Sequence, residues 1–291
     1  MKYPLGINSI SSIASQFETF IIDQWGVIHD GKKGFKFAFK CIEKLYKLNK
    51  NLIIISNSSQ MKAITTQRLI DLGFDVNFFN SVNTSGEMIY NQIKKPTLDW
   101  SRKLGENCFH LFNPSTNNKF IKNLNKNFVD NIHNANFILG STVDPKFKTL
   151  DYVPLLRIGV NKKLPFVCAN PDYESVEAFE NGSKAICMGT IAKLYESLGG
   201  KMYFLGKPSS HIYNESIYKI KNFKKSLTVA IGDSIHHDIL GAKKFGIKSL
   251  LITSGIHKKR FFDLSPTWNE HADKYFGSSV RPDFICEKFI Y

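Results

Sequence analysis

The sequence predicts an α/β protein with a doubly wound parallel sheet, into which a second, smaller α/β domain is inserted. Three observations lead to this fold. Apolar runs typical of buried strands alternate with amphipathic stretches, as expected when helices connect parallel strands. Polar side chains follow several of these strands directly. A central stretch also carries short strands of its own, and 291 residues suffice for two domains.

The N-terminal part alternates strand and helix. The run "FETFIID" (17–23) reads as a buried strand, and apolar residues then recur every three or four positions over 35–48, which predicts a helix. "NLIIIS" (51–56) is a second buried strand. A helix capped by Ser58 or Ser59 follows and ends at Gly73, and a further helix is expected to begin at Thr84.

The C-terminal part repeats this alternation, with a strand over 226–233, a helix ending near Gly246 and a strand over 247–253. The middle of the chain carries its own candidate strands, at 108–112, 136–142, 164–170 and 183–188. We therefore expect a core formed by 1–101 and 188–291, with 102–187 as the inserted domain.

Composition indicates a water-soluble globular protein, with 43% hydrophobic and 22% charged residues. No apolar run approaches the ~20 residues that a membrane-spanning helix needs. The N-terminal stretch is too polar for the core of a secretory signal. Five scattered cysteines without a CxxC pair suggest reduced thiols, so we expect a cytoplasmic protein.

The net charge of +14 comes from dispersed lysine doublets rather than a basic tail. Dispersed charge mainly affects solubility, so a solvated surface is the favoured interpretation. Steering of small anionic substrates and contact with nucleic acid are the alternatives. No signature of a nucleic-acid-binding module is present, so we expect neither nucleic acid nor a membrane as partner.

Four polar elements follow buried strands or their turns: Asp23, 56–59, 206–208 and 232–238. In an open parallel sheet, ligands bind at the carboxyl ends of the strands, where the winding reverses. These elements supply carboxylates, a hydroxyl, helix-start amides and an ammonium, which suit a divalent cation and a phosphoryl group. A carboxylate can also act as the nucleophile and form an aspartyl-phosphate.

The motifs "FIIDQWGVIHDG", "IIISNSS", "FLGKPSS" and "VAIGDSIHHDILGAKKFGI" resemble the haloacid dehalogenase (HAD) superfamily, and within it subfamily IIA, the p-nitrophenylphosphatase-like sugar-phosphate and nucleotide phosphatases. The resemblance runs from about Thr19 to the C-terminus. It implies a HAD core with a large α/β cap inserted between Asn57 and Lys207. "CANPDYE" (168–174) resembles the cap loop that faces the substrate.

Carried onto this chain, the resemblance implies the catalytic residues. Asp23 is the expected nucleophile and a magnesium ligand, and Asp233 is a second magnesium ligand. Ser56 is expected to hydrogen-bond the transferred phosphoryl group, and Lys207 to neutralise the charge it shares with the nucleophile. Asp238 is expected to orient the metal shell or Lys207. Such electrostatic positioning is most of what phosphoryl transfer requires.

The resemblance also implies residues that contact a small phosphorylated metabolite: Asn57, Ser58, Asn170 and Asp172. A simple turn is an equal alternative for Asn170 and Asp172, because asparagine, proline and aspartate favour turns. Caps of this subfamily often dimerise, so a homodimer through the cap is a further expectation.

Trp25 departs from the family pattern, in which a second aspartate lies two residues after the nucleophile and acts as general acid and base. The Trp25 backbone carbonyl can still bind magnesium, but an indole cannot exchange protons in this way, and the loss typically costs ~10²–10⁴-fold in rate. We expect the indole to pack the nucleophile loop, and stacking on an aromatic or sugar ring is the alternative. His29 and Asp30 are the candidate replacements.

Two functions therefore stay open. The first is a magnesium-dependent phosphatase that hydrolyses a small phosphate ester through an aspartyl-phosphate on Asp23. The alternative is a catalytically weakened HAD-fold protein that binds a phosphorylated metabolite or a partner without efficient turnover; Trp25 is the residue that keeps this alternative open.

Overall fold

The computed structural model describes residues 4–116, 123–175, 186–258 and 280–291. It confirms the α/β class. The chain divides into two compact units, one made of Met1–Ser56, Ala63–Asn83 and Lys207–Tyr291, the other of Asn57–Lys62 and Thr84–Gly206. The second unit is thus wider than the expected 102–187. None of the helices in the described parts is both long and apolar enough to span a bilayer.

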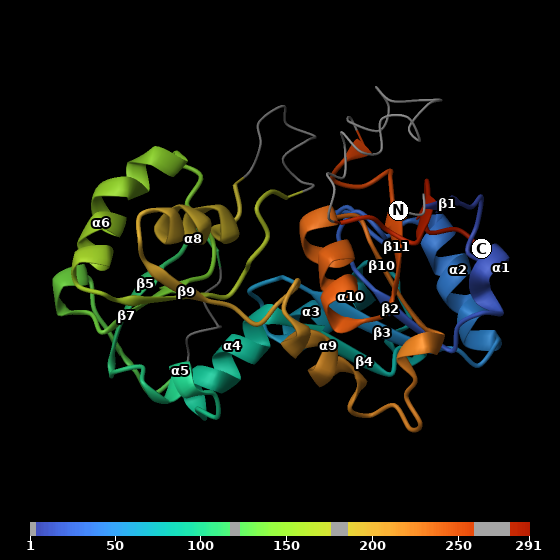
Figure 1. Cartoon of the computed structure of the whole chain (residues 1–291), viewed down its shortest axis with the longest axis horizontal. Coiled ribbons are helices and arrows are strands. Elements are labelled where there is room, and N and C mark those ends of the chain that lie inside the picture. Colours follow the sequence, from blue (N-terminus) through green and yellow to red (C-terminus); the bar gives the residue numbers. More distant parts are fainter. Residues whose placement is uncertain (1–3, 117–122, 176–185, 259–279) are drawn as a thin grey trace. The chain divides into compact units, whose positions relative to one another are not determined.

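The first unit is built on a seven-stranded sheet in the order β1-β12-β11-β10-β2-β3-β4, coloured from blue to red in Figure 1. The pairings described along this sheet are parallel. Its strands are β1 (Leu5–Gly6), β2 (Thr19–Ile22), β3 (Asn51–Ser56), β4 (Ser81–Thr84), β10 (Thr228–Gly232), β11 (Lys248–Ile252) and β12 (Phe284–Cys286).

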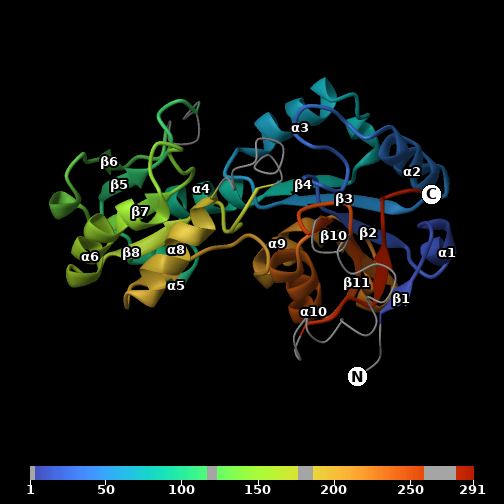
Figure 2. The same cartoon turned by 90° about the horizontal axis from the view of Figure 1, so that it is seen from above.

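Helices cover both faces of this sheet, as the doubly wound expectation requires. In Figure 2, α2 and α3 lie on one face, and α9 and α10 on the other. The helices of this unit are α1 (Ser11–Ala14), α2 (Lys36–Lys47), α3 (Lys62–Asp71), α9 (Ser210–Ile217) and α10 (Leu240–Phe245). The helix that was predicted to end near Gly246 is α10, which is preceded by a π-helical turn, η6 (Ile235–Ile239).

Strand β2 shows why the strand segments of this sheet contain continuous apolar runs. Phe20 and Ile22 join a core cluster with the α2 residues Ile42 and Leu45, whereas Ile21, equally buried, alternates to the opposite face. Since helices cover both faces, every position of the strand must be apolar.

The register of β2 brings two motifs together. Ile22 pairs with Ile231 of β10 on one side and with Ile54 of β3 on the other. The chain leaves β2 for β3 and β4 on one side, while β10, β11 and β12 lie on the other, so the winding reverses at β2. Asp23 therefore lies at the switch point of the sheet.

The second unit has its own five-stranded sheet, in the order β6-β5-β7-β8-β9, with parallel pairings. Its strands are β5 (Asn107–Leu111), β6 (Asn127–Phe128), β7 (Phe137–Gly140), β8 (Pro165–Cys168) and β9 (Lys201–Tyr203); its helices are α4 (Ser85–Lys94), α5 (Asp99–Arg102), α6 (Val153–Asn161) and α8 (Met188–Ser197). Thr84 caps α4, because its side chain accepts a hydrogen bond from the Glu87 N–H.

Alternation along β7 places one core on each face of this sheet. Phe137 and Leu139 pack in a cluster with Ile89 and Ile93 of α4, whereas Ile138 packs in another that includes residues of α6 and α8. One strand expectation fails here. Within 183–188, residues 183–185 lie outside the described residues and Met188 already begins α8, so its described part is not a strand.

Candidate active site

Asp23 follows directly after β2 and is only 7% exposed. Its backbone N–H donates to the carbonyl of Ile231 at 2.9 Å, which continues the β2–β10 ladder by one residue. The nucleophile candidate is thus fixed to a central strand rather than to a loose loop, which suits a group that must be aimed. Ser56 ends the neighbouring strand β3 and is buried as well.

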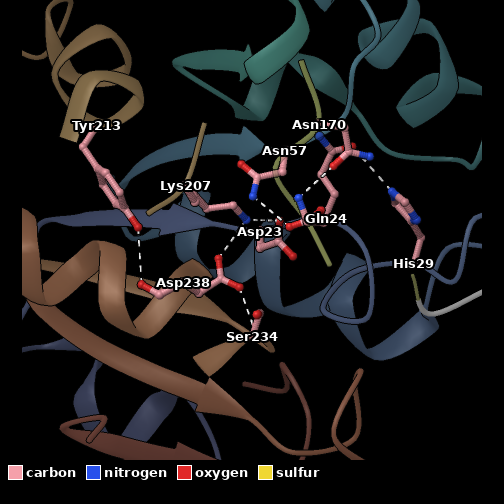
Figure 3. A network of polar contacts seen from close by, with 10 residues as sticks. Asp23, Gln24, His29, Asn57, Asn170, Lys207, Tyr213, Ser234 and Asp238 are labelled. Carbon is pink, nitrogen blue, oxygen red and sulfur yellow. Dashed lines mark hydrogen bonds and ion pairs between the residues drawn. The ribbon is translucent and has the colours of Figure 1, made fainter. Parts of the chain in front are cut away.

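Lys207 connects two of the carboxylates. Its ammonium nitrogen lies 2.5 Å from Oδ1 of Asp23 and 2.8 Å from Oδ1 of Asp238, and all three side chains are buried (Figure 3). A buried ammonium is stable only when it is paired in this way. The pairing joins three sequence motifs at a single point.

Asp238 is held from two sides. Its Oδ2 accepts a hydrogen bond from the Ser234 N–H at 3.1 Å, and its backbone carbonyl accepts one from the Tyr213 hydroxyl at 3.4 Å (Figure 3). A Cβ atom at Gly232 would lie 2.0 Å from the Asp238 Cγ. Glycine at the end of β10 therefore leaves the space in which this carboxylate sits.

Asp233 faces the other two carboxylates. Burial, followed by repulsion from Asp23 and Asp238, raises its pKa well above the usual range. Its Oδ2 accepts the Ile256 N–H at 2.8 Å. One oxygen from each of Asp23, Asp233 and Asp238 can be chosen so that all three lie within 4.8 Å of one another.

This cluster fits a divalent cation. Three buried carboxylates face one ammonium, so negative charge is in excess where water is scarce. A hard cation with oxygen ligands is the partner that such a donor set suits. Asp23, Asp233 and Asp238 are the residues that could hold it, and the Trp25 carbonyl stays a predicted ligand.

Trp25 is packed within the first unit. The Trp25 and His29 rings meet edge to face with centroids 5.0 Å apart, and the Arg68 guanidinium carbon lies 5.4 Å from the Trp25 ring centroid. The indole is partly exposed. Its contacts with His29 and Arg68 are those of the packing interpretation.

His29 is buried, neutral and engaged. Burial, with a smaller contribution from the Arg68 charge, lowers its pKa to about 4. Its Nδ1 accepts the Gly31 N–H at 3.1 Å, so the ring proton of the neutral form lies on Nε2, which is 3.5 Å from the Gln24 Oε1. Asp30 is tied to its own turn by the N–H groups of Lys32 and Lys33.

We expect acid destabilisation that depends on His29. Because its folded pKa lies near 4 and its unfolded pKa near 6.5, the unfolded chain binds the extra proton between these values. Stability should fall by up to about 3 kcal/mol from this residue as pH drops from 6.5 to 4. Urea unfolding of His29→Gln should show a smaller loss over this range, while His133→Gln, at an exposed site, should match the wild type. An unchanged loss in His29→Gln would contradict the assignment.

The predicted substrate contacts all belong to the second unit. The Asn57 Nδ2 donates to the Asp172 Oδ1 at 2.7 Å, and the Asp172 N–H donates to the Asn170 Oδ1 at 3.0 Å. The Ser58 Oγ accepts the Gln60 N–H at 3.2 Å. Asn170 and Asp172 thus form the simple turn that was the alternative to substrate contact, and Asn57 is hydrogen-bonded to this turn. Their substrate roles stay predictions.

Arg68, Gln24 and Tyr213 contact site residues but were missed by sequence reasoning. Tyr213 lies on α9 and Arg68 on α3, and neither stands in a motif. Gln24 follows the nucleophile, where no residue type was expected. Only the hydrogen bond from Tyr213 to a backbone carbonyl and the placement of Arg68 over an indole reveal them, and sequence spacing indicates neither.

Two family models match this chain. A family model described as haloacid dehalogenase-like hydrolase matches residues 20–122, and one described as HAD-hydrolase-like matches residues 204–289. Together they contain Asp23, Ser56, Lys207, Asp233 and Asp238. The chain belongs to the haloacid dehalogenase-like hydrolases. The predicted family membership is therefore confirmed.

Individual HAD relatives support subfamily IIA. The ribonucleotide monophosphatase NagD of Escherichia coli (strain K12) is 31% identical over 101 residues, which are 35% of this chain and only 38% of that relative. A HAD-like hydrolase from Brucella suis 1330 has a similar structure, with TM-score 0.77, 24% identity and coverage of 86% of this chain and 90% of that one. A possible sugar phosphatase of the HAD superfamily from Cytophaga hutchinsonii also has a similar structure. Its TM-score is 0.72, its sequence identity is 22%, and the match covers 99% of each chain. At these identities, the structural matches establish the fold.

Proposed function

We propose that this chain is a magnesium-dependent phosphohydrolase that cleaves a small phosphate ester through an aspartyl-phosphate on Asp23. One observation carries the proposal: the Lys207 ammonium bridges Asp23 and Asp238 within a buried cluster that also contains Asp233. A nucleophile, a fixed positive charge and a cation-binding set of oxygens are what phosphoryl transfer needs from a protein.

The residues divide the work as follows. An Asp23 oxygen attacks phosphorus, the P–O bond to the leaving group breaks, and its electron pair departs on the leaving oxygen. Lys207 offsets the charge shared by Asp23 and the phosphoryl group, and Asp238 holds Lys207 in place. Ser56 would donate to a phosphoryl oxygen. A bound divalent ion supplies further charge compensation.

The substrate is proposed only by class. A NagD relative named as a ribonucleotide monophosphatase and a structural neighbour titled as a possible sugar phosphatase favour a small phosphorylated metabolite. A homodimer formed through the inserted unit belongs to the same proposal.

The alternative is a binding protein with little turnover, and Trp25 is the observation that favours it. The two functions differ in how activity depends on the leaving group. A missing general acid should matter little for aryl and acyl phosphates but greatly for alkyl phosphates, whose alkoxides leave poorly without a proton.

We therefore expect magnesium-dependent hydrolysis of p-nitrophenyl phosphate, with alkyl phosphates slower by ~10²-fold or more because the acid is absent. Trp25→Asp should recover part of the alkyl activity, and Trp25→Phe, which keeps a ring without an acid, should not. Steady-state kcat/KM over a panel of leaving groups measures this. Negligible turnover of aryl phosphates, together with retained binding of beryllofluoride and magnesium, would favour the binding protein instead.

A further inference from the structure

The chain places a positive charge against Trp25, the residue that stands where the family normally has an acid. Arg68 lies on α3, 43 positions after Trp25 in the sequence, and its guanidinium carbon is 5.4 Å from the Trp25 ring centroid. Trp25 is two residues from Asp23. The charge also reaches His29, where it contributes to the lowered pKa. Arg68 is therefore held against the loop that follows the nucleophile.

The guanidinium has no acidic partner among the residues that the structure describes. The acidic residue nearest to Arg68 in the sequence, Asp71, and the one in the loop after Trp25, Asp30, accept hydrogen bonds from other residues. Asp30 accepts the N–H groups of Lys32 and Lys33, and Asp71 accepts a hydrogen bond from Gln67 at 2.8 Å. Arg68 itself is exposed. Its planar fork of N–H donors is free to bind an oxyanion, which it matches in geometry.

We propose that Arg68 is a specificity-determining residue that binds the leaving group of the substrate when that group departs as an oxyanion. The substrate class is then acyl phosphates and phosphoanhydrides, whose leaving groups are a carboxylate and a phosphate. This inference rests on the proposed function, because it names the substrate of the same site.

The chemistry explains why an arginine can stand in for an acid with these substrates only. An alkoxide must be protonated as it leaves, and an arginine guanidinium does not give up its proton in a protein. A carboxylate or phosphate leaves without a proton, so a fixed positive charge is sufficient to stabilise it. The indole beneath Arg68 keeps that charge in place by a cation–π contact.

The reaction balances without an external acid. A bond forms between an Asp23 oxygen and phosphorus, and the bond from phosphorus to the leaving oxygen breaks. The electron pair stays on that oxygen, which departs as an anion. Water then attacks the aspartyl-phosphate, the Asp23 carboxylate is regenerated, and both protons of the water leave on inorganic phosphate as dihydrogen phosphate.

Binding of a non-hydrolysable phosphoanhydride tests Arg68 apart from turnover. With magnesium present, isothermal titration of the wild type should show imidodiphosphate binding at least ~10-fold tighter than in Arg68→Ala, the effect expected for one charge-assisted contact. Orthophosphate should bind both proteins within about 2-fold, which also shows that the Asp23 site is intact in the variant. Arg68→Lys should recover part of the loss. Arg102→Ala removes an exposed arginine paired with Asp99 in the other unit and should change nothing.

Kinetics supply the second readout. Arg68→Ala should lower kcat/KM for acetyl phosphate and pyrophosphate by at least ~10-fold. Should the wild type hydrolyse aryl phosphates while Arg68→Ala keeps wild-type imidodiphosphate affinity and acetyl phosphate turnover, the inference is overturned and the proposed function stands. Selective loss of imidodiphosphate affinity in a protein that turns nothing over would support the role of Arg68 in binding and refute the proposed turnover. If the wild type binds neither anion, both fail.

Discussion

Replacing Lys207 with alanine is expected to lower kcat/KM by about 10²–10³-fold, the usual cost of losing one preorganised group that stabilises transition-state charge. The same change should lower the free energy of unfolding by about 3–5 kcal/mol, because it leaves buried carboxylates without their cation. Both effects have one cause, the ammonium held by Asp23 and Asp238.

The two effects can be separated by a second substitution. Lys207→Ala/Asp238→Asn removes one of the uncompensated charges, so urea unfolding should show part of the stability restored while kcat/KM stays low. Lys248→Ala is the matched control, because Lys248 pairs with Asp283 at a solvent-accessible site, where an ion pair contributes only about 0–1 kcal/mol. A Lys207→Ala protein with near-normal turnover would remove this lysine from the site.

Removal of the divalent ion should abolish turnover, and Asp233→Asn should remove the response to magnesium. Without a metal ion, burial and then repulsion from Asp23 and Asp238 raise the pKa of Asp233. An acid whose folded pKa is raised binds its proton more tightly in the folded state. Its stabilising contribution is fully present below the unfolded pKa, near 3.8, and is lost as pH rises through the raised folded pKa.

Thermal unfolding with EDTA or with magnesium measures how the contribution of Asp233 to stability depends on pH and on the metal ion. Without metal, the wild type should lose stability toward neutral pH, and Asp233→Asn should lose less because it carries no charge there. Magnesium should raise the wild-type Tm more at pH 7 than at pH 5, since binding requires the ionised carboxylates. Asp99→Asn, which changes a highly exposed aspartate, should behave as the wild type. An undiminished magnesium shift in Asp233→Asn would show that this residue is not a ligand.

The convergence of Asp23, Asp233 and Asp238 could be predicted because it follows from topology. Asp23 and Asp233 each follow directly after a buried strand, and the pairing of Ile22 with Ile231 makes those strand ends neighbours. Asp238 lies in η6, the helical turn that follows β10. The alternating pattern of the strands and helices was readable for the same reason: burial on two faces requires continuous apolar runs.

What the sequence could not predict depends on side chains meeting across long separations. The hydrogen bond between Asn57 and Asp172 spans 115 positions, and its partners are residue types that favour turns anywhere. Arg68 lies on a helix with no distinguishing pattern, and the role proposed for it depends on its contact with the Trp25 ring. The short strand β9 (Lys201–Tyr203) has three residues, too few for a periodic signal.

The glycines beside the carboxylates have a consequence for how this chain can change over time. A Cβ atom at Gly255 would lie 2.1 Å from the Asp233 Oδ2, and one at Gly232 would meet Asp238 as closely. Neither position is reserved for glycine by its backbone, since neither has a positive φ. Even an alanine mutation there would displace a carboxylate, so both codons should be as intolerant of replacement as those of the aspartates. Gly6 has no atom within 4 Å of an added Cβ, so replacement by a larger residue should be tolerated there.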